Sequence, residues 1–300
     1  MTLDKSAILA CGVLAATLTR GAQQITCYVA TPTEVAPVID GDLSDEAWKS
    51  ASVFSDYFAF GKGSQTGTLP TTLRVAYDDH GVYVAIENAG PQPEERWAHN
   101  AVVDQRSAAE SDCAEIYFDP EGLSIGFVKF VANVVGGWCD YKRQDGQVLL
   151  DNWSGAGWRF KTKRSEELWT IEAAFPWVAL EHRAKPGDVW RLLHTRFHWT
   201  GERHALTAVS SSPNGSYVRP DCYGYLYFQK PGETTDLESV GRIVAKDVGN
   251  NWFAVSGGQT VMCDGDGIVR MGTKSELDEA EARAKDEEDE WRRKLEERFK

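Results

Sequence analysis

The feature that most constrains the fold is a segment in which apolar and polar residues alternate and the chain then reverses, TTLRVAYDDHGVYVAIEN at residues 71–88. Apolar side chains occupy every second position on both sides of a turn at 78–81: Leu73, Val75 and Tyr77, then Val82, Val84 and Ile86. A period of two places such side chains on one face of an extended chain. The segment therefore predicts a β-hairpin with one buried face.

Similar strand patterns recur from about residue 31 to residue 229, separated by turn residues. They are a strand at 112–120 that stops at a proline, a long strand at 126–141 with a Gly-Gly bulge or turn, a second hairpin at 157–177, and strands at 188–200 and 223–228. Helical patterns inside this region are short and fall at 44–51 and 177–180. Many short strands between turns predict an all-β fold, an antiparallel β-sandwich of immunoglobulin or jelly-roll type.

The two ends of the chain differ from this central region. Residues 1–24 contain Lys5 and an apolar run from Ala7 to Leu18, which is the layout of a signal peptide and is too short to span a bilayer. We therefore expect export to the periplasm, the cell surface or the medium, and no integral membrane span.

The C-terminal part divides into two segments of different character. Residues 230–274 carry weak strand signals between turns and predict an irregular or β extension. Residues 275–300 are charged and carry a narrow apolar stripe from Leu277 to Phe299, which predicts an amphipathic α-helix as a C-terminal extension. This helix either docks on its own domain or mediates self-association.

The balance of charge argues against two classes of partner. The chain has 45 acidic and 32 basic side chains, a net charge of −13. Nucleic acids and anionic membranes both require clustered Lys and Arg, so neither is expected as a partner. Eleven Trp and ten Tyr residues supply flat faces for ligands as well as for a β-rich core. Trp97, Trp153 and Trp199 lie nearer loops and are the candidates for ligand contact.

Catalytic and metal-binding patterns are weak. Asp112, Glu115 and Asp119 lie close together, but Glu115 alternates to the face opposite Ile116 and no second acid is geometrically tied to it, so a glycosidase pair is not expected. The six cysteines form no C-x-x-C pair, which argues against zinc-ribbon and thioredoxin-type sites. Buried thiols are favoured over disulfides, whose pairing the spacing leaves open.

We do not expect the two strand histidines to bind haem. His194 and His198 share a strand face but lie about 13 Å apart. The three methionines fall outside the predicted sandwich, so a Met–His ligand pair is not expected. We interpret both histidines as surface or groove residues, with Arg196 between them on a polar strip.

An acidic stretch near residue 40 resembles the start of a calcium loop. Asp40, Asp42 and Ser44 have suitable spacing, but the positions that need Gly and Glu carry Asp45 and Ala51. The stretch is therefore interpreted as a structural element that marks the start of the sandwich, and not as a calcium site.

In that interpretation each residue of the stretch has a structural role. We predict that Val38 and Ile39 close a short strand, Gly41 makes a turn, Ser44 caps a helical turn, and Trp48 packs inward.

Six motifs follow one another along the chain: VIDGDLSDEAW, TTLRVAYDDHGVYVAIEN, SDCAEIYFDP, WTIEAAFPWVAL, KPGDVWRLLHTRFHW and YGYLYF. Their order and spacing resemble the family 9 carbohydrate-binding modules, relatives of the DOMON β-sandwiches. The resemblance covers residues 32–229. It implies a β-sandwich that binds sugars, commonly at chain ends, and is often joined to glycoside hydrolases; it implies no cofactor, although some members carry structural calcium.

Members of this family clamp a sugar between two aromatic rings. The first ring's position is Ala109 here, so that plate is missing, and Trp97 from the same loop is the candidate replacement. The second ring's position is Tyr217, which remains aromatic.

The family's polar sugar contacts are partly retained. Its strand glutamate matches Glu115, and its asparagines match Asn133 and Asn214. His204 aligns less closely with a basic residue, and an arginine of the family is Val131 here.

The resemblance thus implies a non-catalytic module that binds oligo- or polysaccharide during polysaccharide breakdown or capture alongside glycoside hydrolases, and residues 1–24 predict that it is exported. The alternative is a structural or interaction domain that has lost sugar binding and associates through its C-terminal helix.

Overall fold

The computed structural model describes residues 26–59, 69–90, 97–144, 147–149, 153–200, 204–210, 220, 223–235, 240, 251–255, 259–263, 269–272 and 293. The chain divides into two compact units. One is Ile25–Thr235, and the other combines Met1–Gln24 with Asp236–Lys300. The first unit contains the predicted sandwich and begins several residues before residue 32. The predicted signal peptide lies outside the described residues, and so does the predicted C-terminal helix, apart from Arg293.

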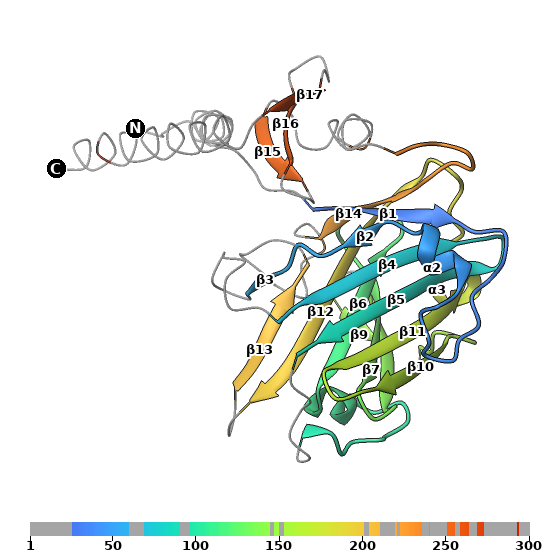
Figure 1. Cartoon of the computed structure of the whole chain (residues 1–300), viewed down its shortest axis with the longest axis vertical. Helices are drawn as coiled ribbons and strands as arrows, with labels where there is room; N and C mark the ends of the chain where they lie inside the picture. Colours follow the sequence, from blue (N-terminus) through green and yellow to red (C-terminus); the bar gives the residue numbers. More distant parts are fainter. Residues whose placement is uncertain are drawn as a thin grey trace, which may run out of the picture. The chain divides into compact units, whose positions relative to one another are not determined.

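The first unit is built almost entirely of strands (Figure 1). They are β1 (Cys27–Pro32), β2 (Val53–Phe54), β3 (Phe58–Ala59), β4 (Thr71–Tyr77), β5 (Gly81–Ala89), β6 (Cys113–Asp119), β7 (Phe127–Asn133), β8 (Trp138–Gln144), β9 (Gln147–Leu149), β10 (Arg159–Arg164), β11 (Leu168–Pro176), β12 (Val189–Thr200), β13 (His204–Val209) and β14 (Gly224–Phe228). The helical segments described are α2 (Glu46–Ser50), the 3₁₀ helix η2 (Arg106–Glu110) and α3 (Trp177–Leu180). The all-β prediction is confirmed.

These strands form one sheet in the order β10-β11-β5-β4-β1-β14-β12-β6-β7-β8-β9, with β2, β3 and β13 attached at its side. Neighbouring strands are antiparallel except at β1, which pairs in parallel with both β4 and β14. The prediction of a purely antiparallel sheet is therefore wrong at β1. The strand patterns in the sequence begin only at about residue 31, whereas β1 begins at Cys27.

The sheet curls so that its two halves face each other across the main core (Figure 1). Val84 and Ile171 come from one half, and Ile116 and Phe130 from the other, and all four are at most 5% exposed. Burial of this apolar surface from both halves is the main stabilising contribution to such a fold.

The hairpin predicted at 71–88 is confirmed as β4 and β5, with Tyr77 opposite Val82. Its turn is fixed by Asp78, whose Oδ1 accepts the backbone N–H groups of His80 at 2.6 Å and Gly81 at 3.1 Å. Position 81 requires glycine, because a Cβ there would lie 2.2 Å from the carbonyl oxygen of Phe175 on β11.

Both faces of this hairpin are buried, although the alternation predicted only one. Tyr83 and Ala85 on the outer face are 4% and 0% exposed because Trp48 of α2 packs against them. Small and aromatic side chains on the second face therefore belong to a second core cluster.

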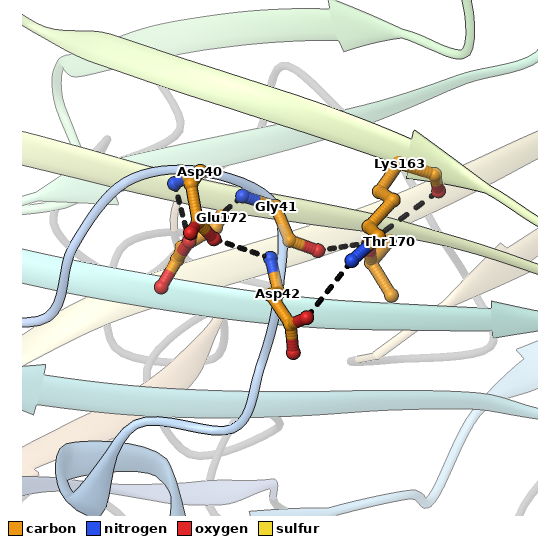
Figure 2. A network of polar contacts seen from close by, with 6 residues as sticks. All are labelled: Asp40, Gly41, Asp42, Lys163, Thr170 and Glu172. Atoms are coloured by element: carbon orange, nitrogen blue, oxygen red, sulfur yellow. Dashed lines mark hydrogen bonds and ion pairs between the residues drawn. The ribbon is translucent and has the colours of Figure 1, made fainter.

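Backbone N–H groups of the acidic stretch near residue 40 donate hydrogen bonds to a buried carboxylate (Figure 2). Glu172 of β11 is 0% exposed, and its Oε2 accepts the backbone N–H groups of Asp40 and Gly41, each at 2.9 Å. Its Oε1 accepts the indole N–H of Trp48 at 2.8 Å. The architectural interpretation of this stretch is supported, and Trp48 packs inward as predicted at 2% exposed.

Two details of that interpretation are wrong. Val38 and Ile39 are not part of a strand, and β1 ends earlier, at Pro32. The N-cap of α2 is Asp45, not Ser44. Asp45 uses its carboxylate to accept the backbone N–H of Val38 at 2.9 Å instead of capping the helix. The hydrogen bond between Asp45 and Val38, seven residues apart, thus closes the turn. Helix-capping patterns do not predict this contact.

The predicted long strand at 126–141 is two strands. β7 and β8 pair antiparallel, with Phe130 opposite Asp140, and the Gly-Gly pair closes the turn between them. Of the two alternatives left open, a bulge or a turn, the structure shows a turn.

In the second unit the described strands are β15 (Asn251–Val255), β16 (Gln259–Cys263) and β17 (Val269–Gly272). They form an antiparallel sheet in sequence order. These strands fall where the sequence shows weak strand signals. No helix among the described residues is long and apolar enough to cross a membrane.

Candidate functional site

The outer face of β12, β6, β7 and β8 carries a cluster of polar side chains. Strand alternation places Thr195 of β12, Glu115 and Tyr117 of β6, Lys129 of β7 and Tyr141 of β8 on the face opposite the main core. We call these five residues the outer polar cluster. It contains Glu115, which the sequence predicted as a sugar contact.

Apolar side chains cover this cluster on two sides. Tyr223, next to β14, packs against Tyr117 and Phe127, and Ala108 of η2 packs against Cys113 and its neighbours. Glu115 is therefore only 4% exposed and Lys129 only 6% exposed.

Glu115 and Lys129 form a buried ion pair. The Lys129 Nζ lies 2.7 Å from the Glu115 Oε1. The Tyr117 hydroxyl donates to the other carboxylate oxygen, and the Thr195 hydroxyl donates to that same oxygen at 3.5 Å. Burial alone would lower the pKa of Lys129, but the Glu115 carboxylate and Tyr141 outweigh it and raise that pKa above its usual range.

The two tyrosines complete the surroundings of the ammonium. Lys129 Nζ lies 4.9 Å from the centre of the Tyr117 ring and 4.8 Å from that of Tyr141, within range of cation–π attraction. Burial and the nearby Glu115 carboxylate raise the pKa of Tyr117 well above its usual value, so its hydroxyl stays protonated and acts as a donor.

Asn133 ends β7 on the same outer face, and its side chain holds loops together. Its Nδ2 donates to the carbonyls of Asn100 at 2.6 Å and Ala108 at 3.1 Å. Its Oδ1 accepts the N–H groups of Val135 at 3.1 Å and Gly137 at 2.7 Å. These four contacts match the four that an amide can make. The role predicted for Asn133 toward a sugar hydroxyl stays a prediction.

Trp97, the predicted replacement plate, stacks on Trp199 at the end of the same face. The ring centroids are 5.0 Å apart and the planes differ by 22°. Asp112 ties the two residues together: its N–H donates to the Trp97 carbonyl at 2.9 Å, and its Oδ1 accepts the N–H of Trp199 at 2.7 Å. Both indoles are half-buried, so they present a braced aromatic surface beside the outer polar cluster.

Of the remaining predicted site residues, the structure describes only the backbone of His204. Tyr217 and Asn214 lie outside the described residues. His204 begins β13, where its backbone pairs with Thr200 of β12. The structure therefore brings Glu115, Asn133 and Trp97 to one face of one half-sheet, and it leaves the sugar-contact roles of all six residues as predictions.

His194 and His198 are not surface or groove residues, contrary to the sequence interpretation. They are 0% and 4% exposed and lie on the inner face of β12. The Nδ1 of His194 lies 2.6 Å from the Tyr57 hydroxyl, and the Nδ1 of His198 lies 2.6 Å from Asp112 Oδ2. Burial, with a contribution from the charge of Arg196, lowers the pKa of His194 to about 3.

Arg196, between the two histidines, is also buried and joins the two halves of the sheet. One of its terminal nitrogens donates to the carbonyls of Pro70 at 3.0 Å and Ala89 at 2.8 Å and to the Thr71 hydroxyl at 3.2 Å. Burial lowers the pKa of Arg196 to about 10. The predicted polar strip exists, but it faces the interior.

The thiols and carboxylates of the described residues offer no catalytic arrangement. Cys113 and Cys139 are buried thiols, as predicted, and burial raises the pKa of Cys139 to about 12. Glu115 is paired with Lys129 and Asp112 with His198. Across the described ranges, no group of three or more His, Cys, Asp or Glu side chains is placed to hold a metal ion.

Alternation within the strand correctly predicts Tyr117 on the face of Glu115. Sequence reasoning missed Lys129 and Thr195 as neighbours of Glu115. Lys129 and Thr195 depend on the register of β7 and β12 against β6, which alternation within one strand does not define.

The comparison with known families agrees with this architecture. The sequence profile of the family described as "Carbohydrate family 9 binding domain-like" matches residues 39–230. The chain belongs to this family. The resemblance noted in the sequence is thereby confirmed, and the matched segment contains every strand from β2 to β14.

Solved structures of family 9 modules share the fold. A module from Caldicellulosiruptor kristjanssonii in complex with glucose matches with a TM-score of 0.53 and 16% identity, over 70% of this chain and 99% of that one. A structure of such a module from the same organism with cellotriose matches with a TM-score of 0.50 and 16% identity, over 70% and 98% of the two chains. A comparison with curated protein sequences gives no significant match.

Proposed function

We propose that this family 9 module binds carbohydrate and carries no catalysis of its own. The observation that supports this proposal most directly is the family match over residues 39–230. Structures of modules with the same fold contain glucose and cellotriose, so β-linked gluco-oligosaccharides are the ligands to test first.

The proposed sugar surface is the outer face that carries Glu115 and Trp97, together with the predicted contacts of Tyr217, Asn214, Asn133 and His204. A carboxylate has about four acceptor directions, and Glu115 uses three of them for Lys129, Tyr117 and Thr195. Among the described residues one direction remains, but the carboxylate is only 4% exposed, so a sugar contact at Glu115 requires the covering side chains to move. The half-buried indoles at the end of this face offer apolar area for the C–H face of a sugar ring.

We further propose that the fold is an antiparallel β-sandwich of immunoglobulin or jelly-roll type apart from β1, that the module is exported, and that it acts beside glycoside hydrolases. The apolar run from Ala7 to Leu18 after Lys5 supports export. Binding requires no cofactor in this proposal, and a structural calcium remains a feature to test by metal analysis of the purified protein.

A ligand panel tests the proposal. Isothermal titration of the full chain with glucose, cellotriose, xylotriose and mannotriose should give heat with at least one of them. Absence of heat with all four sugars at millimolar concentration would contradict the choice of ligand class.

Two observations favour the alternative, a domain that has lost sugar binding. Asn133 already makes its four contacts inside the protein, and Ala109 stands where the family has an aromatic plate. Size-exclusion chromatography with and without residues 275–300 separates the two functions. An oligomer that depends on this segment, combined with no sugar affinity, would favour the alternative.

A further inference from the structure

A second buried polar cluster lies on the inner face of the sheet, away from the outer polar cluster. Asn88 of β5 is 0% exposed, and Trp169 of β11 and Arg196 of β12 are each 1% exposed. Both amide atoms of Asn88, the indole nitrogen of Trp169, and Nε and Nη2 of Arg196 are closed to solvent and have no hydrogen-bond partner in the described part of the chain. Buried polar atoms are almost always partnered by protein, water or an ion. We call these three residues the inner donor cluster, and their unpartnered atoms point to a bound ligand.

The pairing of the strands brings the three residues to one place. Asn88 lies directly opposite both Thr71 of β4 and Trp169 of β11. Side chains of directly opposite residues share a face, with Cβ atoms about 5 Å apart. Arg196 Nη1 donates to the Thr71 hydroxyl at 3.2 Å and to the carbonyl of Ala89, the residue after Asn88, at 2.8 Å. The guanidinium is therefore fixed beside Asn88, and Asn88 lies beside Trp169.

The unpartnered atoms of this cluster are mostly donors. Arg196 contributes one N–H at Nε and two at Nη2, Asn88 contributes two at its amide nitrogen, and Trp169 contributes one at its indole nitrogen. The acceptor among them is the amide oxygen of Asn88. A water molecule donates as well as accepts, whereas an anion only accepts. An anion therefore satisfies this set of donors better than water does.

Arg196 also has no counter-ion of its own. Across the described ranges its guanidinium forms no ion pair, and the Asp112 carboxylate, whose charge acts on it, already accepts from His198 and from the backbone of Trp199. Burial lowers the pKa of Arg196 only to about 10, so the guanidinium is charged at neutral pH. A buried charge without a partner is costly, which makes a bound anion stabilising here.

The packing beside the inner donor cluster limits the size of the ligand. An apolar cavity of about 20 Å³ adjoins the cluster, and its lining includes Ile86 and Ile171, the next residues on the same face as Asn88 and Trp169. A volume of this size holds about one water-sized particle. A ligand of the cluster is thus of atomic size, and a sugar or an organic acid is too large.

We infer that Arg196, Asn88 and Trp169 hold a small monovalent anion of the size of chloride. The ion accepts the two parallel N–H groups on the Nε–Nη2 edge of the guanidinium, which is the edge suited to paired contacts. It also accepts the amide N–H of Asn88 and the indole N–H of Trp169. The ion thereby links β5 and β11 in one half of the sheet to β12 in the other. This inference does not depend on the proposed sugar surface, which lies on the opposite face of the sheet.

Thermal unfolding of the full chain in sodium gluconate and in sodium chloride tests the site. Chloride replaces gluconate from 0 to about 100 mM at constant ionic strength, so that screening of surface charges stays the same. A ligand that binds only the folded chain stabilises it by mass action, and we expect Tm to rise by at least about 2 °C. The same Tm in both salts would overturn the inference.

Asn88→Asp separates a bound anion from a general effect of salt. Its carboxylate lies beside the guanidinium and takes the place of the ion, so Tm in gluconate should equal or exceed that of the unmodified chain. The rise of Tm with chloride should disappear. Gln105→Glu adds the same charge at an exposed position and should keep the full rise. An undiminished chloride response in N88D would contradict the site.

Trp169→Phe tests the indole contact. It keeps a ring in the core and removes one N–H, so the affinity for chloride, taken from the dependence of Tm on its concentration, should fall about tenfold. Trp48→Phe is the matched control, because it removes an indole N–H that donates to Glu172 in another core cluster. It lowers Tm but should keep the chloride affinity. Equal affinities in W169F and W48F would argue against the site.

Anomalous diffraction from crystals of the full chain grown in sodium bromide locates the ion directly. We expect a bromide peak within hydrogen-bond distance of Arg196 Nε and Nη2 and of the Trp169 indole nitrogen. A water molecule at that position, with no anomalous signal, would overturn the inference. This readout needs no variant, so it decides the question even if N88D or W169F fails to fold.

Discussion

Glu172 shows how one buried carboxylate organises the start of the module. It is 0% exposed and receives the backbone N–H groups of Asp40 and Gly41 (Figure 2). It also receives the indole N–H of Trp48. Burial raises its pKa, and the contacts from Trp48, Gly41 and Asp40 oppose that rise. A buried carboxylate is costly unless donors of this kind surround it, so the opening stretch and β11 depend on each other.

Replacing Glu172 with glutamine should destabilise the protein. The amide has one acceptor oxygen in place of two, so at least one of the three donors loses its partner, at a cost of about 2 kcal/mol. Urea unfolding measures the loss. Asp42→Asn, which removes the exposed pair with Lys163, is the control and should not shift the midpoint. An E172Q midpoint equal to that of the unmodified chain would contradict the structural role of this carboxylate.

His194 should make stability depend on pH. It is 0% exposed, contacts Tyr57 and lies near Arg196, and its pKa is lowered to about 3. The unfolded chain binds this proton below about pH 6.5 and the folded chain does not, so stability is full above pH 6.5 and falls as the pH drops toward 3. Between pH 7 and pH 5 this residue should cost about 2 kcal/mol.

Urea unfolding at those two pH values checks this expectation. His194→Gln removes the titration, so its loss of stability between pH 7 and pH 5 should be smaller than that of the unmodified chain. His182→Gln, at a histidine 42% exposed, is the control and should leave the pH dependence unchanged. Equal pH dependence in H194Q and the unmodified chain would show that His194 is not buried in the neutral form.

At the scale of elements, the pairing of β6 with β7 places a buried charge pair on the outer face. Removing one member of such a pair leaves the other charge buried and uncompensated, which typically costs about 3 kcal/mol. We expect that loss in Glu115→Gln and in Lys129→Met, and a smaller loss in the double variant than the sum of the two. A double-mutant cycle by urea unfolding measures the coupling.

The Lys142–Glu181 pair is the matched comparison. Its side chains are 22% and 39% exposed, so its coupling should be below about 1 kcal/mol. Equal coupling energies for the buried and the exposed pair would contradict the burial of Glu115 and Lys129.

The strands themselves were largely predictable, because alternation and turn residues mark them directly. β4, β5, β6, β10 and β11 lie where these patterns predict strands. β1 was missed because it is a short segment, buried on both faces, that pairs in parallel with β4 and β14, and no turn signal accompanies a parallel pairing. Parallel partners come from distant parts of the chain, which one sequence does not reveal.

The candidate site was predictable only within single strands. Alternation correctly puts Glu115 on the face opposite Ile116, yet that face is covered, so Glu115 is buried instead of open to solvent. The burial of His194 and His198 has the same cause. Which face of a strand points into the core depends on how the sheet curls, and short-range patterns do not contain that information.

At the scale of the whole molecule, the curl of the sheet gives its strands an inner face that packs in the main core and an outer face. On one half, the outer face carries Glu115 and Asn133 and ends at Trp97, three residues that we predict to contact a sugar. A β-sheet scaffold keeps such side chains in fixed relation, because each strand is held by its neighbours on the sheet.

The most direct test of the central claim, that this module binds carbohydrate through the family's aromatic position, is calorimetric titration of cellotriose into the full chain and into two variants at Tyr217. Tyr217→Phe keeps the ring and should bind within about twofold of the unmodified chain. Tyr217→Ala removes the ring and should lose about tenfold in affinity, as expected for one lost stacking contact. Equal cellotriose affinity in the unmodified chain and in Y217A would contradict the account.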